Sequence, residues 1–368
     1  MIIKSFKAQN FRNIDTCFLE FENGTNLLLG QNAQGKTNAV EGIYLFARGK
    51  SFRRGDERDL VKFGAEGFNV SICYEDRNGE NTLEYAIYGR ERKRKKNGYK
   101  LSRASEMIGN FKAVLFSPDD LTLVKGGPDE RREFLNVAIS QCFPTYISLY
   151  TDYKRALENR NALLKNASKG LYFDERELDA WSLSLAEYAS YIYIERRKYI
   201  KKLEVYAKSF MYSISDGKED LEISYKSDIT DDISELDREI IKEEYVKIFK
   251  DNIVRERGAG VTLFGPHRED IIIKINGKDA RIYSSQGQQR SIVLSLKMAE
   301  GEVIRELFSE YPVFLFDDVL SELDEKRQNF VLEGMRDRQI IITSCESIKI
   351  SGRIILVDGG SFKTCTCT

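Results

Sequence analysis

Short apolar runs separated by polar turns occupy both ends of the chain. The stretches 15–30 and 68–89 are predicted strands, the second being a pair joined by the turn "DRNGEN". Toward the other end, 311–317 and 338–345 are nearly continuous apolar runs, which is the pattern of buried strands. Strands mixed with helices at both ends predict an α/β fold class.

The middle of the chain has helical periodicity instead. From Pro128 to about Lys208 it is almost entirely helical, and Pro128 and Pro144 suit first helical positions. A shorter helix is predicted over about 231–257. These helices are interrupted too often to form a long coiled-coil arm. We therefore predict two lobes: a discontinuous α/β lobe formed by 1–115 with 300–368, and a mostly helical lobe formed by 116–299.

One loop has the full pattern of a phosphate-binding loop. "GQNAQGKT" matches G-x-x-x-x-G-K-[ST] between a predicted strand and a predicted helix. Its glycines let the backbone amides face phosphates, and the helix adds its positive end. Lys36 is expected to bind the β- and γ-phosphates and Thr37 to bind Mg²⁺. With ATP and Mg²⁺ as ligands, the expected nucleotide-binding residues are Gly30, Gln31, Asn32, Ala33, Gln34, Gly35, Lys36, Thr37 and Asn38.

Two carboxylates follow the apolar run "VFLF". Asp317 is expected to hold the Mg²⁺ through water, together with Thr37. Asp318 is placed to orient or deprotonate an attacking water. Asp318 and Lys36 are therefore the candidate catalytic residues.

A second phosphate-binding pattern lies far from the first along the chain. "SSQGQQRS" begins at Ser284 and leads into a strong helical pattern over 292–307. It resembles the signature motif of ABC-type ATPases, roughly L-S-G-G-Q. The matching residues are Ser285, Gly287 and Gln288, whereas Ser284 and Gln286 depart from the motif.

The segment "SELD", from Ser321 to Asp324, resembles the D-loop of the same class. In that class, the signature caps the γ-phosphate that a second subunit holds. The resemblance therefore implies an ATP-dependent homodimer in which two chains exchange halves of two composite sites.

The likeness extends to the bacterial RecF family of SMC-like ATPases. "NFRN", "GQNAQGKTN", "LFSPDDLTLVKGGPDERREFLN", "LFGPHRED", "SQGQQRS" and "DDVLSELD" occur in the family's order across nearly the whole chain. The resemblance implies an ABC/SMC-like P-loop ATPase head with an inserted helical lobe. It also implies a weak, DNA-dependent ATPase that clamps DNA during replication and recombinational gap repair and helps load recombinase. The implied partners are gapped, double-stranded or single-stranded DNA, RecR, and RecO through RecR.

Three positions depart from the ABC pattern. Asp318 stands where Glu is usual, which predicts slow turnover. The expected switch His is absent, and Thr343 or Ser344 stands near its place. A Q-loop Gln is also missing, and Asp119 or Asp120 is the candidate there.

Overall charge does not indicate DNA binding, because 57 Lys and Arg balance 58 Asp and Glu to a net charge of −1. Any DNA-binding surface must therefore be local. The run "RERKRKK" is predicted to cap a hairpin, either as a solvated turn or as a contact to DNA phosphates. Its candidate DNA-binding residues are Arg92, Lys93, Arg94, Lys95 and Lys96.

Cysteine usage and hydropathy favour a cytoplasmic protein without a zinc site. The six Cys are scattered and His267 is the single His, so a reducing compartment is expected. The start lacks the apolar run of a signal peptide, and no stretch approaches the ~18 apolar residues of a membrane span. The alternatives to a DNA clamp are a metabolic P-loop kinase and a transporter-type ABC ATPase subunit.

Overall fold

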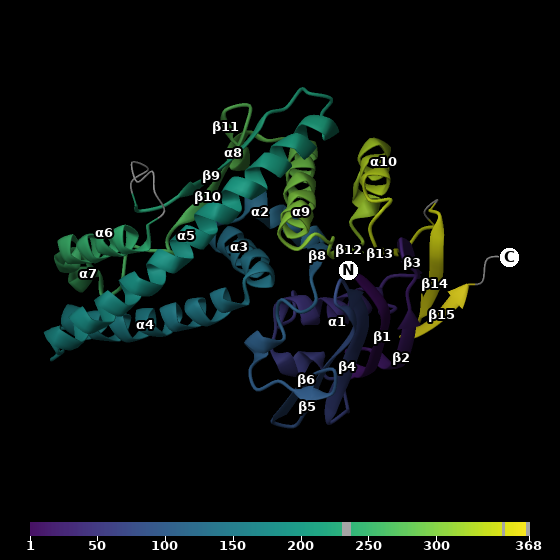
Figure 1. Ribbon diagram of the computed structural model, residues 1–368, viewed down its shortest axis with the longest axis horizontal. Helices are drawn as coiled ribbons and strands as arrows, with labels where there is room; N and C mark the ends of the chain where they lie inside the picture. The colour runs from purple at the N-terminus through teal and green to yellow at the C-terminus, as the bar shows by residue number, and fades with distance from the viewer. Residues whose placement is uncertain (230–236, 348–349, 366–368) are drawn as a thin grey trace. The chain divides into compact units, whose positions relative to one another are not determined.

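The computed structural model of the chain describes residues 1–229, 237–347 and 350–365 (Figure 1). The chain divides into two compact units. The first comprises Met1–Leu121, Tyr206–Glu219 and Ser285–Thr368, and the second comprises Thr122–Val205 and Asp220–Ser284. This division differs from the expected lobes, because the segments 116–121, 206–219 and 285–299 group with the first unit rather than with the helical one.

A mainly parallel sheet forms one layer of the first unit. Its strand order is β15-β14-β3-β13-β12-β8, and only β15 runs antiparallel to its neighbour. The strands are β3 (Thr25–Leu29), β8 (Ala113–Phe116), β12 (Val313–Asp317), β13 (Ile340–Ser344), β14 (Gly352–Asp358) and β15 (Ser361–Cys365). β8, β12 and β13 are buried throughout, which explains their nearly continuous apolar runs.

An antiparallel sheet forms the other layer, in the order β2-β1-β4-β5-β6-β7. Its strands are β1 (Ile2–Phe11), β2 (Ile14–Glu20), β4 (Gly67–Asp76), β5 (Gly79–Tyr88), β6 (Glu91–Lys96) and β7 (Tyr99–Lys100). Helix α1 (Lys36–Arg48) contacts strands of both sheets (Figure 1). The basic run expected to form a turn is instead strand β6, paired with β5, and the turn is Asn97-Gly98 beyond it.

Helix α9 (Gln286–Phe308) belongs to the first unit because it packs on that unit's parallel sheet. It contacts β8 and the short helix η3 (Pro118–Leu121), and Lys297 forms a 3.3 Å ion pair with Asp120. The remaining helices of this unit are η1 (Glu57–Leu60), η2 (Ala104–Glu106), η4 (Leu320–Glu322) and α10 (Glu325–Gly334).

The second unit is mostly helical, as the periodicity predicted. It contains α2 (Thr122–Lys125), α3 (Pro128–Cys142), α4 (Pro144–Ser168), α6 (Arg238–Asp251), α7 (Ile253–Ala259) and α8 (Ala280–Tyr283). The 40-residue α5 (Glu175–Ile214) contributes to both units, and no long coiled coil is present in the described residues. The single helix expected over about 231–257 is instead α6 and α7, and α6 begins after Asp237, whose side chain caps it. The expected residues 231–236 lie outside the described residues.

A small antiparallel sheet completes the second unit, in the order β11-β10-β9. Its strands are β9 (Leu221–Lys226), β10 (Asp270–Ile275) and β11 (Lys278–Asp279). The Asn276-Gly277 turn has positive φ at both residues, which confirms the predicted hairpin.

His267, in the "GPHRED" turn, has a structural role in this unit. Its Nδ1 accepts a hydrogen bond from the Tyr153 hydroxyl at 2.6 Å, and its Nε2 lies 3.2 Å from the Thr262 carbonyl oxygen. Burial lowers the pKa of His267 to about 4, so the ring is neutral at pH 7. A neutral ring held by both nitrogens fits a packed turn better than a general base.

Replacing Gly301 by Ala is expected to destabilise the first unit. A Cβ at Gly301 of α9 would lie 2.3 Å from Phe314 Cζ on β12, so one of the two elements must move. Overpacking of this kind costs about 1–3 kcal/mol. Urea unfolding followed by circular dichroism checks the loss. The matched control is Gly258→Ala on α7, where no atom lies within 4 Å of the added Cβ and stability should hold or rise. Equal stability of the two variants would contradict the proposed close approach.

Candidate functional site

The carboxyl ends of three neighbouring parallel strands meet at one edge of the sheet. β13 lies between β3, which leads into the Gly30–Thr37 loop, and β12, which ends at Asp317. The strand register places Thr343 opposite both Leu28 and Asp317. Ligands of open α/β sheets bind at this kind of edge. The loop and the carboxylates, far apart in sequence, therefore belong to one site.

Two glycines are required by the geometry of the loop. A Cβ at Gly30 would lie 2.2 Å from the Val357 carbonyl oxygen of β14. Gly35 has φ 114°, in the region that favours glycine, and precedes the first residue of α1. The chain can therefore turn sharply from β3 into α1, which leaves the amino end of α1 facing the loop.

Asn13, in the "NFRN" motif, holds this loop in place. Its Nδ2 donates to the Ala33 carbonyl oxygen at 3.3 Å, and its Oδ1 accepts from Asn38 Nδ2 at 2.6 Å. Arg12, beside it, forms a bidentate ion pair with the fully buried Glu41 of α1. The motif was recognised in the sequence, but the residue types alone do not reveal that it supports the phosphate loop.

Lys36 is buried inside the loop it belongs to. Its ammonium donates to the carbonyl oxygens of Gly30 at 2.6 Å and Gln31 at 3.0 Å, and to Cys345 Sγ at 3.3 Å. The Cys345 thiol in turn donates to Asn32 Oδ1 at 2.7 Å. Sequence reasoning missed Cys345, because a cysteine after a strand has no signature of its own. Neutral partners leave the charge of Lys36 available to an anion.

Asp317 is the buried carboxylate of the site. Thr343 Oγ1 donates to its Oδ1 at 3.0 Å, and the Thr37 hydroxyl also forms a hydrogen bond with it. Burial raises the pKa of Asp317, although these two hydrogen bonds oppose the change. Of the two switch candidates, Thr343 contacts the Asp317 carboxylate, whereas Ser344 Oγ donates to the Glu346 carbonyl oxygen.

Asp318 continues from β12 in an uncommon backbone conformation. Its φ is 54°, in the left-handed region, and its amide donates to Thr343 Oγ1 at 2.8 Å. Thr343 therefore positions both carboxylate residues. Conformations of this kind gather at functional sites.

The residues present fit a magnesium ion. The described residues contain no cluster of three or more His, Cys, Asp or Glu that could hold a metal. Thr37 and Asp317 offer two oxygen ligands in contact with each other. Mg²⁺ is commonly bound by one or two such protein ligands, with waters and phosphate oxygens completing its shell. A cation beside Asp317 would also offset the cost of burying its charge.

The signature-like segment starts helix α9. Ser285 Oγ accepts from the Gln288 amide at 3.2 Å, and Gln288 Oε1 accepts from the Ser285 amide at 2.8 Å, forming a capping box. Gln286 and Gly287 form the first turn of α9 between them. None of the contacts described for these residues involves the phosphate loop.

The D-loop joins Asp318 to helix α10. Ser321 Oγ donates to the Asp318 carbonyl oxygen at 2.9 Å. Asp324 caps α10 by accepting from the Arg327 amide at 3.0 Å. The D-loop residues therefore lie between the carboxylates and a helix terminus.

Asp120, one of the two Q-loop candidates, forms polar contacts within the protein. It accepts from the Ser117 amide at 2.6 Å and pairs with Lys297 of α9. These contacts fasten the end of β8 to α9.

The five basic residues of β6 all have partners within the chain. Arg92 pairs with Glu57 at 2.7 Å, Lys96 donates to Asn110 Oδ1 at 2.7 Å, and Arg94 stacks on Tyr85. Lys93 and Lys95 form looser ion pairs, at 3.6 Å with Glu91 and at 3.5 Å with Glu84. Exposed pairs of this length are weak, so these two lysines are the ones that can exchange partners for phosphates.

Comparisons with known proteins agree with this architecture. Residues 2–352 match the family model described as RecF/RecN/SMC N terminal domain. The chain is 39% identical to the DNA replication and repair protein RecF of Clostridioides difficile over 94% of this chain and 92% of that one. It is 41% identical to RecF of an Exiguobacterium species, again over 94% and 92%.

Solved structures show the same fold. A structure of the recombination mediator protein RecF with ATP, from the RecFOR pathway, has a TM-score of 0.92 at 35% identity and covers 99% of this chain and 98% of that one. An SMC head bound to the C-terminal winged-helix domain of ScpA has a TM-score of 0.58 at 14% identity, over 99% and 97%, which shows the fold alone.

Fold and site together define a P-loop ATPase head of the ABC/SMC type. Within that class, the chain belongs to the RecF family, whose members are DNA replication and repair proteins. None of the helices in the described part of the chain combines the length and apolar character needed to span a membrane.

Replacing Asp317 by Asn is expected to stabilise the chain without ligands. The raised pKa means that the folded state binds its proton more tightly than the unfolded state, so the ionised form at pH 7 opposes folding. Stability should therefore fall as pH rises from the unfolded pKa of Asp through the folded one. The variant should unfold at a higher urea concentration, its free energy of unfolding should rise by about 0.5–2 kcal/mol, and this pH dependence should be lost. Lower stability of the variant would contradict the burial argument.

Proposed function

We propose that the chain is a slow ATPase that dimerises on ATP and clamps DNA during replication and recombinational gap repair. One observation carries the proposal. Lys36, Thr37 and Asp317 converge at one sheet edge, whereas Ser285 caps a separate helix with no described contact to that edge. A nucleotide site that lacks its signature within the chain is completed by a second chain.

Binding begins when the phosphates of ATP replace the neutral partners of Lys36. The ammonium exchanges the two loop carbonyl groups for phosphate oxygens, and the amino end of α1 adds its positive dipole. Thr37 and Asp317 would hold Mg²⁺, which neutralises charge on the phosphate oxygens when bound. The solved structure of a related RecF with ATP supports this ligand.

Hydrolysis requires a base or an orienting group beside the γ-phosphate. Asp318 follows Asp317 directly, and its left-handed backbone turns its side chain away from the direction that β12 would otherwise impose. Its carboxylate is one carbon shorter than the Glu usual in the ABC class. The shorter side chain leaves a greater distance between the carboxylate and the attacking water, which supports the proposal of slow turnover.

Dimerisation places Ser285 and the amino end of α9 against the γ-phosphate of the other chain. Two-fold symmetry makes both sites equivalent, because each chain then gives one loop and receives one signature. ATP stabilises the closed dimer since it binds that state better than the open one, and hydrolysis removes this stabilisation. The clamp then opens.

DNA, RecR, and RecO through RecR are the proposed partners, and loading of recombinase onto gapped DNA is the proposed outcome. The RecFOR pathway named for the solved relatives supports these partners. With this role, the protein is expected to be cytoplasmic.

Mixing two inactive variants tests the composite site. Lys36→Ala should lose ATP binding, and Ser285→Arg should bind ATP as a monomer but fail to dimerise with itself. In a mixed dimer, the ATP of the Ser285→Arg chain meets the intact signature of the Lys36→Ala chain. One of the two sites is then competent, so the mixture should hydrolyse ATP although neither variant does so separately. Steady-state phosphate release measures this.

The composite site would be wrong if the mixture stayed inactive while gel filtration showed mixed dimers. Activity of Ser285→Arg in the absence of the other variant would show that the signature acts within its own chain or not at all.

Lys93→Gln combined with Lys95→Gln tests β6 as a DNA surface. For each DNA phosphate that the variant no longer binds, the slope of log affinity against log salt should fall by about 0.7–0.9. Binding to gapped DNA at several salt concentrations measures the slope, and ATP binding should be unchanged. The opposite control, Glu84→Gln with Glu91→Gln, frees both lysines and should tighten DNA binding. An unchanged slope in both variants would make β6 a solvated strand.

A further inference from the structure

Arg327 of α10 connects two motifs of the first unit that are distant in sequence. Its Nη2 donates to the Gly287 carbonyl oxygen at 3.2 Å and its Nε donates to Ser291 Oγ at 2.8 Å, both in the first turns of α9. Its Nη1 forms an ion pair with Asp324 at the end of the D-loop. One guanidinium thus joins the signature helix to the D-loop of the same chain.

The contact does not serve to stabilise α9 as a helix. The amino end of a helix carries a partial positive charge, so a cation in the first turn is unfavourable there. Asp324 offsets part of this cost through its ion pair with Arg327. The contacts made by the three guanidinium nitrogens of Arg327 therefore need another explanation.

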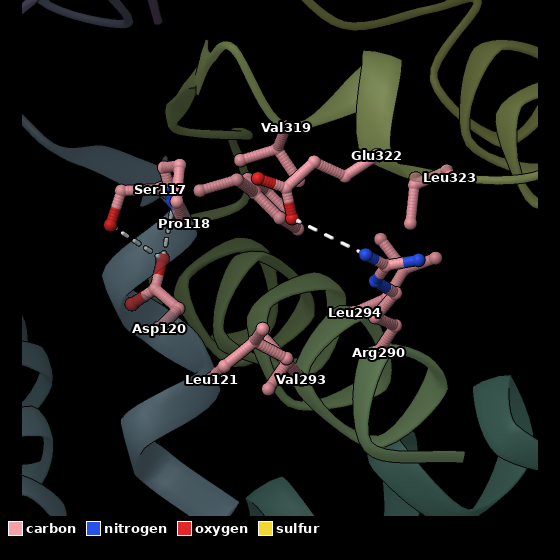
Figure 2. A pocket seen from close by; sticks show the side chains of 11 residues that line it. Ser117, Pro118, Asp120, Leu121, Arg290, Val293, Leu294, Val319, Glu322 and Leu323 are labelled. Atoms are coloured by element: carbon pink, nitrogen blue, oxygen red, sulfur yellow. Dashed lines mark hydrogen bonds and ion pairs between the residues drawn. The ribbon is translucent and has the colours of Figure 1, made fainter. Parts of the chain in front are cut away.

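A small, partly open apolar pocket separates part of α9 from the segment between β12 and α10. It has a cavity volume of about 30 Å³ and lies between α9, the end of β8 with η3, and that segment (Figure 2). Val293 and Leu294 line it from α9, Leu323 from the D-loop, and Val319 from the segment just before the D-loop. Across this pocket the apolar side chains make fewer contacts with one another. Polar links at its edge therefore contribute to the position of the D-loop.

Two such links are described, and they differ in strength. Figure 2 shows Arg290 of α9 facing Glu322. The ion pair between them is 3.7 Å long, and both side chains are 38% exposed. Exposed pairs at this distance contribute little. Arg327 makes three contacts with a planar group whose donors have fixed directions, so it restrains both position and orientation.

At its other end, the D-loop is hydrogen-bonded to Asp318, the residue that follows β12. Ser321 Oγ donates to the carbonyl oxygen of Asp318, and Gln328 Nε2 donates to the carbonyl oxygens of Leu320 at 2.8 Å and Leu323 at 3.0 Å. Polar contacts therefore run from Asp318 through the D-loop and Arg327 to the turn that Ser285 caps.

We propose that Arg327 is a positioning residue that couples the two ATP sites of the dimer. The inference rests on the proposed composite sites. There, the signature of a chain contacts the ATP of its partner, whereas Asp318 acts on the chain's own ATP. Arg327 then transmits the occupancy of the partner's site to the chain's own carboxylate. Each site hydrolyses faster when the other is filled, and neither D-loop needs to touch the opposite signature.

Arg327→Gln should lower ATP turnover per site in the homodimer by about 5-fold or more, the range of measured couplings between sites. ATP affinity of the monomer should be unchanged because Lys36 and Thr37 are untouched. Arg327→Lys keeps the charge but cannot reach two acceptors on α9 and Asp324 together, so it should not restore turnover. The matched control is Lys326→Gln, which removes the neighbouring ion pair with Asp216 and should have no effect.

The mixture of Lys36→Ala and Ser285→Arg, which has one working site, separates coupling between the sites from a structural effect of Arg327 on its own site. With one working site there is no second site to couple to, so adding Arg327→Gln to either chain should change the ATP turnover of the mixture less than about 2-fold. The rate per site of the Arg327→Gln homodimer should match that of the mixture. An equal loss in homodimer and mixture, or recovery with Arg327→Lys, would overturn coupling. An inactive mixture with native Arg327 would instead reject the composite site itself.

Discussion

The buried carboxylate of Asp317 is the interaction on which the site depends. It ends β12, accepts from Thr343 of the neighbouring strand β13, and forms a hydrogen bond with Thr37 at the start of α1. These three segments come from distant parts of the chain, and parallel pairing is what brings them together. A buried negative charge with neutral partners opposes folding. The fold tolerates this cost at the position where a bound cation would remove it.

The same separation of charges explains the state of Lys36. Its ammonium is held by carbonyl oxygens and a thiol rather than by Asp317, although both groups belong to one site. A direct ion pair would satisfy both charges and leave neither for a ligand. Separate neutral partners keep a cation and an anion apart, so that phosphates can approach the first and a metal ion the second. The arrangement is thus poised for ligands of both signs.

Local patterns were sufficient to predict most of the fold and the loop. The continuous apolar runs of β12 and β13, the prolines that start α3 and α4, and the Asn276-Gly277 hairpin follow from residue order over a few positions. Contacts between distant segments were not accessible in this way. The roles of Asn13, Cys345 and Arg327 depend on tertiary neighbours, and β6 became a strand because β5 offers an edge for it. The placement of 285–299 likewise follows from packing on β8, which periodicity along one segment cannot reveal.

A division of labour within the first unit follows from these contacts. Residues that touch the phosphate loop are held by the sheet and by several hydrogen bonds to the loop. The signature turn and the D-loop are instead joined by polar contacts beside a small apolar pocket. Rigid parts suit the binding of a nucleotide whose geometry does not change. A connection made by polar contacts suits a segment that must respond when the proposed second chain binds or leaves. The proposed coupling between two sites requires a link between the signature turn and the D-loop, and Arg327 makes contacts with both.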